Sequence, residues 1–142
     1  MLSIYGKNCR PQEAIDAIIA ATAEYPEKTL KKWQKIITAD VNYIHIVISG
    51  EVEIRRVSDE LSMFTMRSAG FLGVSSIYNK ASYMYGIARD TTVIRTIRKD
   101  EFERLIGEKN LWPQFSQILV WYIGLISKRD DIMFARSAYY VV

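Results

Sequence analysis

The sequence predicts a mainly β domain with flanking helices, followed by a long C-terminal helix. Residues 28–97 consist of short β-branched and aromatic runs separated by Gly, Asn, Asp and Ser, which is typical of consecutive antiparallel strands. Residues 11–25 and 99–126 instead carry apolar side chains at helical spacing. With 142 residues, 49% of them hydrophobic and 25% charged, the chain is large enough for one compact core without disulfides or metals.

The first helix is expected over residues 11–25. Pro11 suits a first helical turn, and apolar side chains such as Ile15 and Ile18 follow at helical spacing. Pro26 should end this helix, because a proline inside a helix removes a hydrogen bond and clashes with the preceding turn.

Strands are clearest over residues 44–48 and 51–55, which Ser49 and Gly50 join by a tight link. In the second of these strands apolar and charged side chains alternate, so one face should be buried and the other solvated. The buried face comprises Val52 and Ile54, and the solvated face comprises Glu51, Glu53 and Arg55. A turn is expected at residues 58–60, and residues 61–67 predict another strand.

Helical character returns at Lys99 and ends near Gly107. Asp100 and Glu101 lie in the first turn, where negative charge stabilises the helix dipole. The apolar face of this short helix comprises Phe102, Leu105 and Ile106. Asn110 is expected to cap the final helix, with Trp112 and Pro113 in its opening turn.

The final helix is apolar on essentially every side over residues 118–126, whereas a helix on the surface of one domain needs only one apolar stripe. One set of side chains follows the alternating three and four spacing of a coiled-coil seam: Phe115, Ile118, Leu119, Tyr122, Leu125 and Ile126. Val120, Trp121 and Ile123 would then face the helix's own domain. This pattern predicts a homodimer, and the alternative is a helix buried wholly within one domain.

Three short segments, at residues 48–52, 71–73 and 97–102, occur in an order and at spacings that resemble the cyclic-nucleotide-binding domain of the Crp/Fnr superfamily. The resemblance covers nearly the whole chain. It implies a double-stranded β-helix, or jelly roll, in residues 1–109, together with the N-terminal helix and the short helix. It also implies that residues 110–142 form a dimerisation helix and the start of a linker.

The resemblance also implies a phosphate-binding cassette, but its two charged residues are missing. Val74 stands where the family's glutamate holds the ribose, and Ser82 stands near the arginine that neutralises the phosphate. Losing both contacts predicts at least a roughly hundredfold weaker affinity for cyclic AMP or cyclic GMP. The candidate pocket comprises Phe71, Leu72, Gly73, Val74, Ser75, Ser76, Ser82 and Tyr83. Its composition suits either an unknown small apolar effector or a filled core without a ligand.

The closing segments, residues 111–130 and 137–139, are similar to the IprA (YaiV) branch of this superfamily, whose members continue into a winged helix-turn-helix. The resemblance therefore implies a sensor half of a transcription regulator, which binds DNA through a C-terminal domain absent from this chain. We expect the chain to be a fragment of such a regulator.

Enzymatic and metal chemistry have little support in the sequence. His45 is the only histidine, too few for a cupin-like metal site, and Cys9 is the only cysteine, too few for an iron–sulfur cluster or an internal disulfide. Cys9 lies near Lys7 and Arg10 and is either a redox-sensitive thiol or an ordinary one. We expect a non-enzyme without cofactor. A stand-alone cupin-like binding protein or enzyme is the alternative.

The chain has no secretory signal pattern and no apolar run near the roughly 20 residues of a membrane-spanning helix, so we expect a cytoplasmic protein that does not enter membranes. Its formal net charge is +3. Part of this excess is one basic run: Lys28, Lys31, Lys32 and Lys35. The run is interpreted as a solvated edge, and a role with acidic partners is the weaker alternative.

Overall fold

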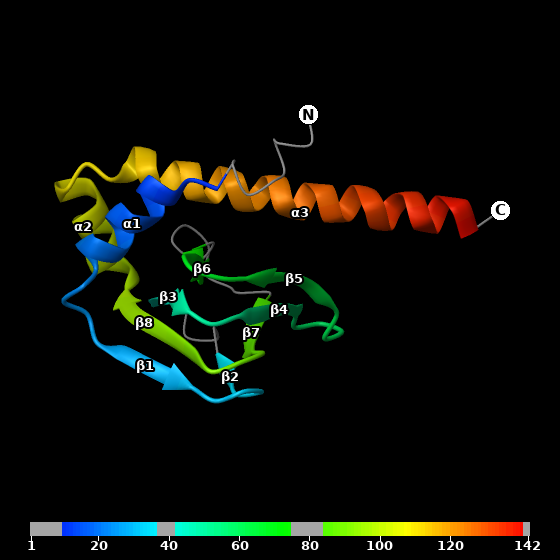
Figure 1. The fold of residues 1–142 in the computed structure, drawn as a ribbon, viewed down its shortest axis with the longest axis horizontal. Helices are drawn as coiled ribbons and strands as arrows, with labels where there is room; N and C mark the ends of the chain where they lie inside the picture. The colour runs from blue at the N-terminus through cyan, green and yellow to red at the C-terminus, as the bar shows by residue number, and fades with distance from the viewer. Residues whose placement is uncertain (1–9, 37–41, 75–83, 141–142) are drawn as a thin grey trace.

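The computed structural model describes residues 10–36, 42–74 and 84–140, with the side chains of the last helix described as far as Leu125 and again at Ser127. Two four-stranded antiparallel sheets form the body of the domain (Figure 1). The first sheet has the order β1 (Glu27–Leu30), β8 (Thr92–Arg98), β3 (Tyr43–Ser49) and β6 (Gly70–Leu72). The second has the order β2 (Lys35–Ile36), β7 (Met84–Ala88), β4 (Val52–Arg56) and β5 (Ser62–Met66). This arrangement confirms the predicted mainly β jelly roll with flanking helices.

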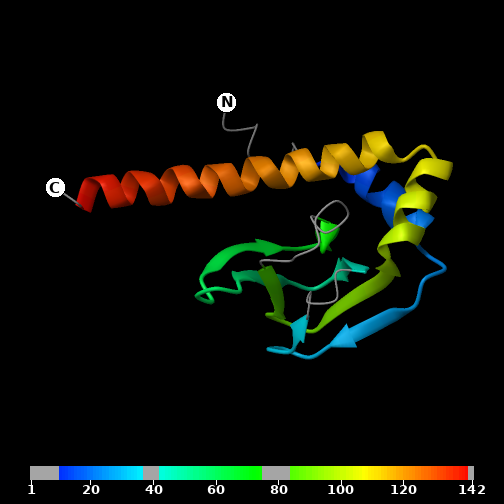
Figure 2. The ribbon, with the colours of Figure 1, turned by 180° about the vertical axis from the view of Figure 1, so that it is seen from behind.

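Three helices cover the roll: α1 (Gln12–Ala21), α2 (Lys99–Glu108) and α3 (Trp112–Tyr140). Both ribbon views show α3 running across the top of the roll and extending beyond it (Figures 1 and 2). Its first half packs against α1, and it also contacts α2 and β5. In the described part of the chain, none of the helices combines the length and hydropathy needed to cross a bilayer.

The first helix ends at Ala21, four residues before residue 25, where the sequence predicted its end. Thr22 stops it by bonding back through its hydroxyl to the carbonyl of Ile18, at 2.9 Å. The buried guanidinium of Arg95 then donates to the carbonyl of Ile19, at 2.6 Å, and to the Thr22 hydroxyl, at 3.0 Å. The end of α1 is therefore fixed by a side chain more than 70 positions away, which satisfies the carbonyl of Ile19 and which a local pattern does not reveal.

The predicted link at Ser49 and Gly50 is present, although it joins two strands that belong to different sheets. Gly50 has a φ of 92°, a conformation that glycine adopts most readily. A Cβ at this position would lie 2.5 Å from the hydroxyl oxygen of Thr92. The change of sheet between β3 and β4 therefore requires glycine.

Asn110 does not cap the final helix, as was predicted, but ends α2. It has a φ of 53°, and its N–H donates to the carbonyl of Gly107 at 3.2 Å. The N–H of Leu111 donates to the carbonyl of Ile106 at 2.9 Å. This pair of bonds is a Schellman motif, and asparagine fits it because its side chain tolerates the left-handed conformation.

One residue of β4, Glu53, was predicted to lie on the solvated face of the strand but is buried. The alternation is present, but Glu53 is buried, with 6% of its surface exposed. Arg55 donates through Nε to its carboxylate at 3.0 Å, and Arg89 forms a second ion pair with it. The hydrogen bond from Arg55, with help from Arg89, lowers the pKa of Glu53 to about 2 against the cost of burial. The two long arginine side chains thus cover a position that alternation alone assigns to solvent.

The variant Glu53→Gln should lower the free energy of unfolding by about 1–3 kcal/mol at pH 7, because it removes the charge that two arginines share. A carboxylate with a depressed pKa stabilises the fold above its unfolded pKa, and this contribution is lost as the pH falls toward 2. The difference between wild type and variant should therefore be constant above about pH 5 and shrink below it. Urea denaturation followed by tryptophan fluorescence from pH 7 to pH 3 measures this difference. A difference that is independent of pH would contradict the ion-pair assignment.

Candidate functional site

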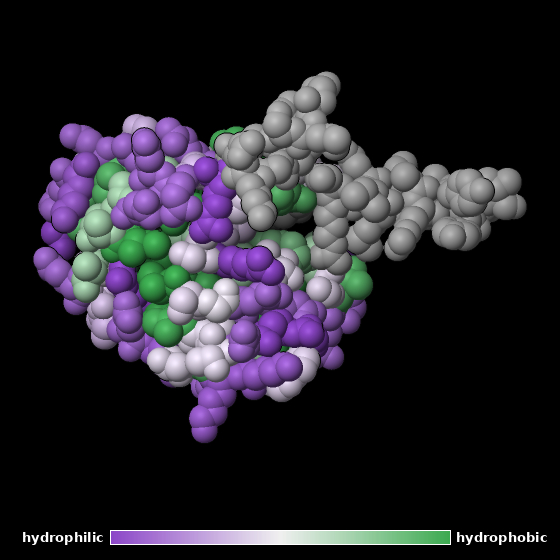
Figure 3. All heavy atoms as spheres, viewed as in Figure 1, coloured by the Kyte–Doolittle hydropathy of each residue, from purple (hydrophilic) through white to green (hydrophobic). Residues whose placement is uncertain are grey.

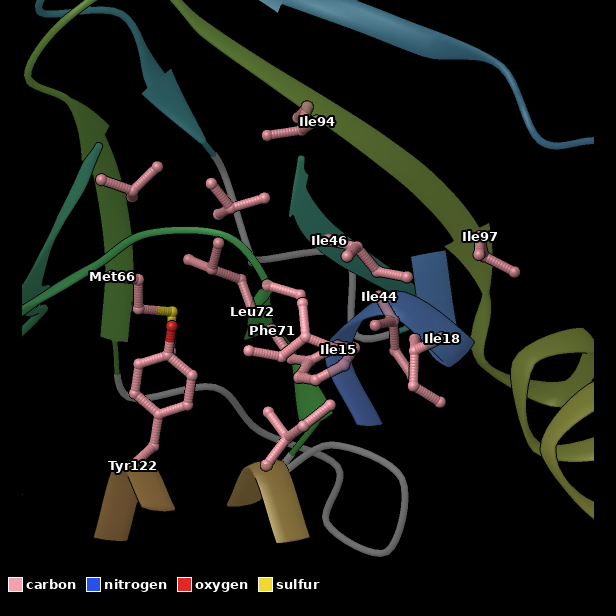
Figure 4. Packing of buried hydrophobic residues seen from close by; sticks show 14 of the residues in the cluster. Ile15, Ile18, Ile44, Ile46, Met66, Phe71, Leu72, Ile94, Ile97 and Tyr122 are labelled. Carbon is pink, nitrogen blue, oxygen red and sulfur yellow. The ribbon is translucent and has the colours of Figure 1, made fainter. Parts of the chain in front are cut away.

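The candidate site is the segment that begins at β6, where the sequence predicts a degenerate cassette. Phe71 and Leu72 are both buried, with 4% and 5% of their surface exposed, and they point to opposite faces of β6. The Phe71 ring lies 5.1 Å from that of Phe115 in α3 and 6.0 Å from that of Phe102 in α2, measured between centroids. Phe71 is therefore part of the core between the roll and the helices (Figure 4).

Leu72 fills the interior of the roll. A Cβ placed on Gly86 in β7 would lie 2.9 Å from Cδ2 of Leu72 and 2.8 Å from Cγ1 of Val52. The two sheets thus meet at this point without room for one additional methyl group. Of the two alternatives left open by the sequence, this packing favours the filled core around Leu72.

Gly73 has a φ of 90°, and a Cβ on it would lie 2.7 Å from the carbonyl oxygen of Tyr43. The turn that leaves β6 is therefore pressed against β3, and only glycine allows this close approach. Val74 follows, half-buried against the core, at the position where the resemblance implies a glutamate. An isopropyl group at this position offers a ribose hydroxyl no acceptor. The other predicted pocket residues, Ser75, Ser76, Ser82 and Tyr83, lie outside the described residues.

The two other side chains considered for chemistry take no part in a cluster that the structure describes. Nδ1 of His45 lies 2.9 Å from the hydroxyl oxygen of Thr96 on the neighbouring strand. Within residues 10–36, 42–74 and 84–140, no three His, Cys, Asp or Glu side chains gather in a way that could hold a metal ion. Cys9 lies outside the described residues.

The apolar faces of α3 agree with the prediction at Trp121, which packs half-buried against the chain's own core, but differ from it at several other positions. Phe115, Ile118 and Tyr122, which were assigned to the coiled-coil seam, are buried in the chain's own core. Leu119 and Leu125 are half-buried beside them, and the side chain of Ile126 is outside the described residues. Val120 and Ile123 were assigned to the chain's own domain, yet 66% and 60% of their surface is exposed. At the buried and exposed positions named above the assignment was wrong, because one spacing of three and four serves a coiled-coil seam and a core-facing stripe equally well.

Tyr122 joins α3 to the chain that enters β6. Its hydroxyl donates to the carbonyl of Arg67 at 2.9 Å, and burial raises the pKa of its phenol to about 12 (Figure 4). Arg10 adds a second tie: it donates to the carbonyl of Ser68, and its guanidinium lies 5.7 Å from the centroid of the Trp121 ring. These two ties were missed at the sequence level, where a tyrosine in an apolar stripe was the only available signal.

No protein-family model matches the chain, and no curated protein matches it. Among solved structures, the chain is similar to the c-di-GMP responsive global regulator CLP of Xanthomonas campestris (TM-score 0.64, 18% identity), over 87% of this chain and 63% of that one. It is also similar to the catabolite activator protein of Thermus thermophilus (TM-score 0.59, 14% identity), over 88% of this chain and 59% of that one.

The heme domain of CooA from Rhodospirillum rubrum gives a TM-score of 0.65 at 16% identity, and the alignment covers 89% of this chain and 96% of that domain. The chain therefore spans about 60% of the first two proteins and nearly all of the heme domain of CooA. Regulatory subunits of protein kinase A are similar as well. At these identities the likeness concerns the fold, and the fold of this chain is that of a cyclic-nucleotide-binding-like domain.

Proposed function

We propose that this chain is the dimerising sensor domain of a Crp/Fnr-type transcription regulator. The observation that carries the proposal is the two-sided apolar character of α3, a helix of 29 residues, which is about 43 Å long. Its inner face completes the chain's own core, and its outer face presents Val120 and Ile123 to solvent. A second copy of the same helix is the simplest way to cover that outer face.

The exposed positions have the spacing of a coiled coil. Ser116, Val120, Ile123 and Ser127 are all exposed and follow one another at intervals of four, three and four residues. The two central apolar side chains would meet their counterparts across a twofold axis. The small serines at either end would let the two backbones approach closely.

We further propose that the roll does not hold a cyclic nucleotide in the family's manner. Val74 replaces the cassette glutamate, and Leu72 occupies the roll interior against Gly86. The fold itself does not select a ligand, since its neighbours include a c-di-GMP responsive regulator and a heme domain.

DNA binding through a further C-terminal domain is part of the same proposal. The coverage of about 60% of two full regulators supports it, because the remainder of those chains lies outside the alignment. We also propose a non-enzymatic, regulatory role. None of the comparisons favours the IprA branch over others, so the proposal stays at the level of the superfamily. No observation in the described residues favours the alternative of a cupin-like binder or enzyme.

The variant Ile123→Glu should convert the dimer into a monomer, because it would bring two carboxylates together at the centre of the proposed helix pair. Light scattering should then give a molar mass that falls from twice to once 16.4 kDa. Gln117→Glu is the matched control, since it adds the same charge at an exposed position on the flank of α3. A monomeric wild type, or a dimer that survives Ile123→Glu, would contradict the proposed helix pair.

Titration with cyclic AMP or cyclic GMP should give no saturable heat at micromolar ligand concentrations. The reason is that an anionic phosphate and a ribose hydroxyl would enter a site without its two charged partners. Isothermal titration calorimetry of the full chain measures this directly. Saturable binding in the micromolar range would refute the degenerate cassette.

A further inference from the structure

The turn between β1 and β2 places a tryptophan where glycine is favoured. Gln34 donates its N–H to the carbonyl of Lys31 at 3.0 Å, which closes a four-residue turn. Trp33, its third residue, has a φ of 74°, a conformation that is unfavourable for a bulky side chain and that turns of this kind normally assign to glycine. Nevertheless 55% of its surface is exposed. Neither turn propensity nor core burial therefore explains the indole.

Backbone hydrogen bonds fix the turn that carries Trp33. The backbone N–H of Trp33 donates to the carbonyl of Ala88 at 2.6 Å, and the backbone N–H of Ala88 donates to the carbonyl of Gln34 at 2.9 Å, so the turn is bonded to the end of β7. The Arg89 guanidinium carbon lies 4.6 Å from the centroid of the indole ring. Arg89 is itself fixed by its ion pair with the buried Glu53. The indole is thus displayed in a fixed position on the outside of the second sheet.

The surroundings of Trp33 are mainly basic, with two carboxylates beside them: Glu53 pairs with Arg89, and Glu60 accepts a hydrogen bond from the Tyr85 hydroxyl at 3.2 Å. We define the Trp33 surface by six residues: Lys31, Lys32, Trp33, Lys35, Tyr85 and Arg89. The ammonium group of Lys32 lies 5.3 Å from the Trp33 ring centroid, and that of Lys35 lies 5.4 Å from the Tyr85 ring centroid. Among the described residues, none of the ion pairs involves any of these three lysines.

The Trp33 surface lies far from α3. In both ribbon views the link between β1 and β2 is at the end of the roll opposite that helix (Figures 1 and 2). Hydrophilic side chains project from this end in the space-filling view (Figure 3). A dimer formed through α3 would therefore leave this surface free on both copies, and an inference about it does not depend on the proposed function.

From this juxtaposition of an exposed, fixed indole with four cationic side chains, we infer that the Trp33 surface is a docking site for an acidic segment of a partner protein. Carboxylates of the partner would pair with the lysines, and an apolar side chain would pack on the edge of the indole. Tryptophan, tyrosine and arginine are the residues that contribute most to protein interfaces, while the surrounding charges steer the encounter. A nucleic acid fits less well, because cations already lie over the ring that a base would need for stacking.

Fluorescence anisotropy of the full chain with a fluorescein-labelled, 12-residue peptide of Glu, Asp and Phe tests this inference. Saturable binding that weakens severalfold as NaCl rises is expected, since the lysines are exposed to screening by salt. Trp33→Gly should weaken binding at least tenfold. The same variant should leave the midpoint of urea unfolding unchanged or higher, because glycine suits a positive φ. Unchanged affinity, or a lower midpoint in Trp33→Gly, would overturn the inference, the latter by showing that the indole serves the fold.

Charge variants separate docking from general attraction to a basic protein. The double variant Lys32→Glu with Lys35→Glu should weaken peptide binding at least tenfold. Lys109→Glu, at the exposed end of α2, should change it less than twofold. Equal losses in these variants would overturn the inference in favour of non-specific attraction. Tighter binding of a labelled 12-nucleotide oligothymidine than of the peptide would overturn it in favour of a nucleic acid.

Discussion

The layers of this domain meet at β6, a strand of three residues that is buried on both faces. Phe71 projects into the helical layer, where its ring contacts Phe102 of α2 and Phe115 of α3. Leu72 projects the other way and meets Gly86 across the roll. A strand that is packed on both sides at the density of a protein interior does not shift without displacing both neighbours. The position of β6 therefore sets the position of the first turns of α3, and with them the direction of the whole helix.

This constraint explains why α3 has two apolar faces with different partners. The inner face belongs to the contacts with β6 and with the chain entering it, through Phe115 and through the Tyr122 hydroxyl on the carbonyl of Arg67. The outer face, with Val120 and Ile123, takes no part in those contacts and stays exposed in the single chain. In the proposed dimer, α3 would join residues 71–74 to the dimer axis through one rigid element, and rigid-body movement of such elements is a common route of allosteric change.

Local patterns predicted the individual strands and helices, whereas the jelly-roll arrangement was predicted from the family resemblance. The positions of the strands, the Ser49–Gly50 link and the negative first turn of α2 each depend on neighbouring residues, and each was found. What was missed depends on residues far apart in the chain. Arg95 ends α1 early from β8, and Arg89 buries Glu53 from beyond the end of β7. Several apolar positions of α3 were assigned to the wrong face, because the same helical spacing fits packing against the chain's own core and packing against a second helix. Trp33 was not singled out, because it lies within a run of lysines. An aromatic residue in the middle of such a basic run could have indicated a binding surface.

The order of the second sheet gives the Trp33 surface a physical connection to α3. That sheet runs β2, β7, β4, β5, so the strand that follows the Trp33 turn lies at one edge and the strand that contacts α3 lies at the other. Glu53 lies in β4, between β7 and β5, and forms ion pairs with Arg89, which follows β7, and with Arg55 of its own strand. The strand order connects the Trp33 surface with α3, but contact alone does not couple them. Coupling requires two arrangements of the sheet, one of which a bound partner would favour over the other. If a partner on the Trp33 surface favoured one arrangement of this sheet over another, the effect could reach α3 through β5 without a cavity inside the roll, whose interior is occupied by Leu72.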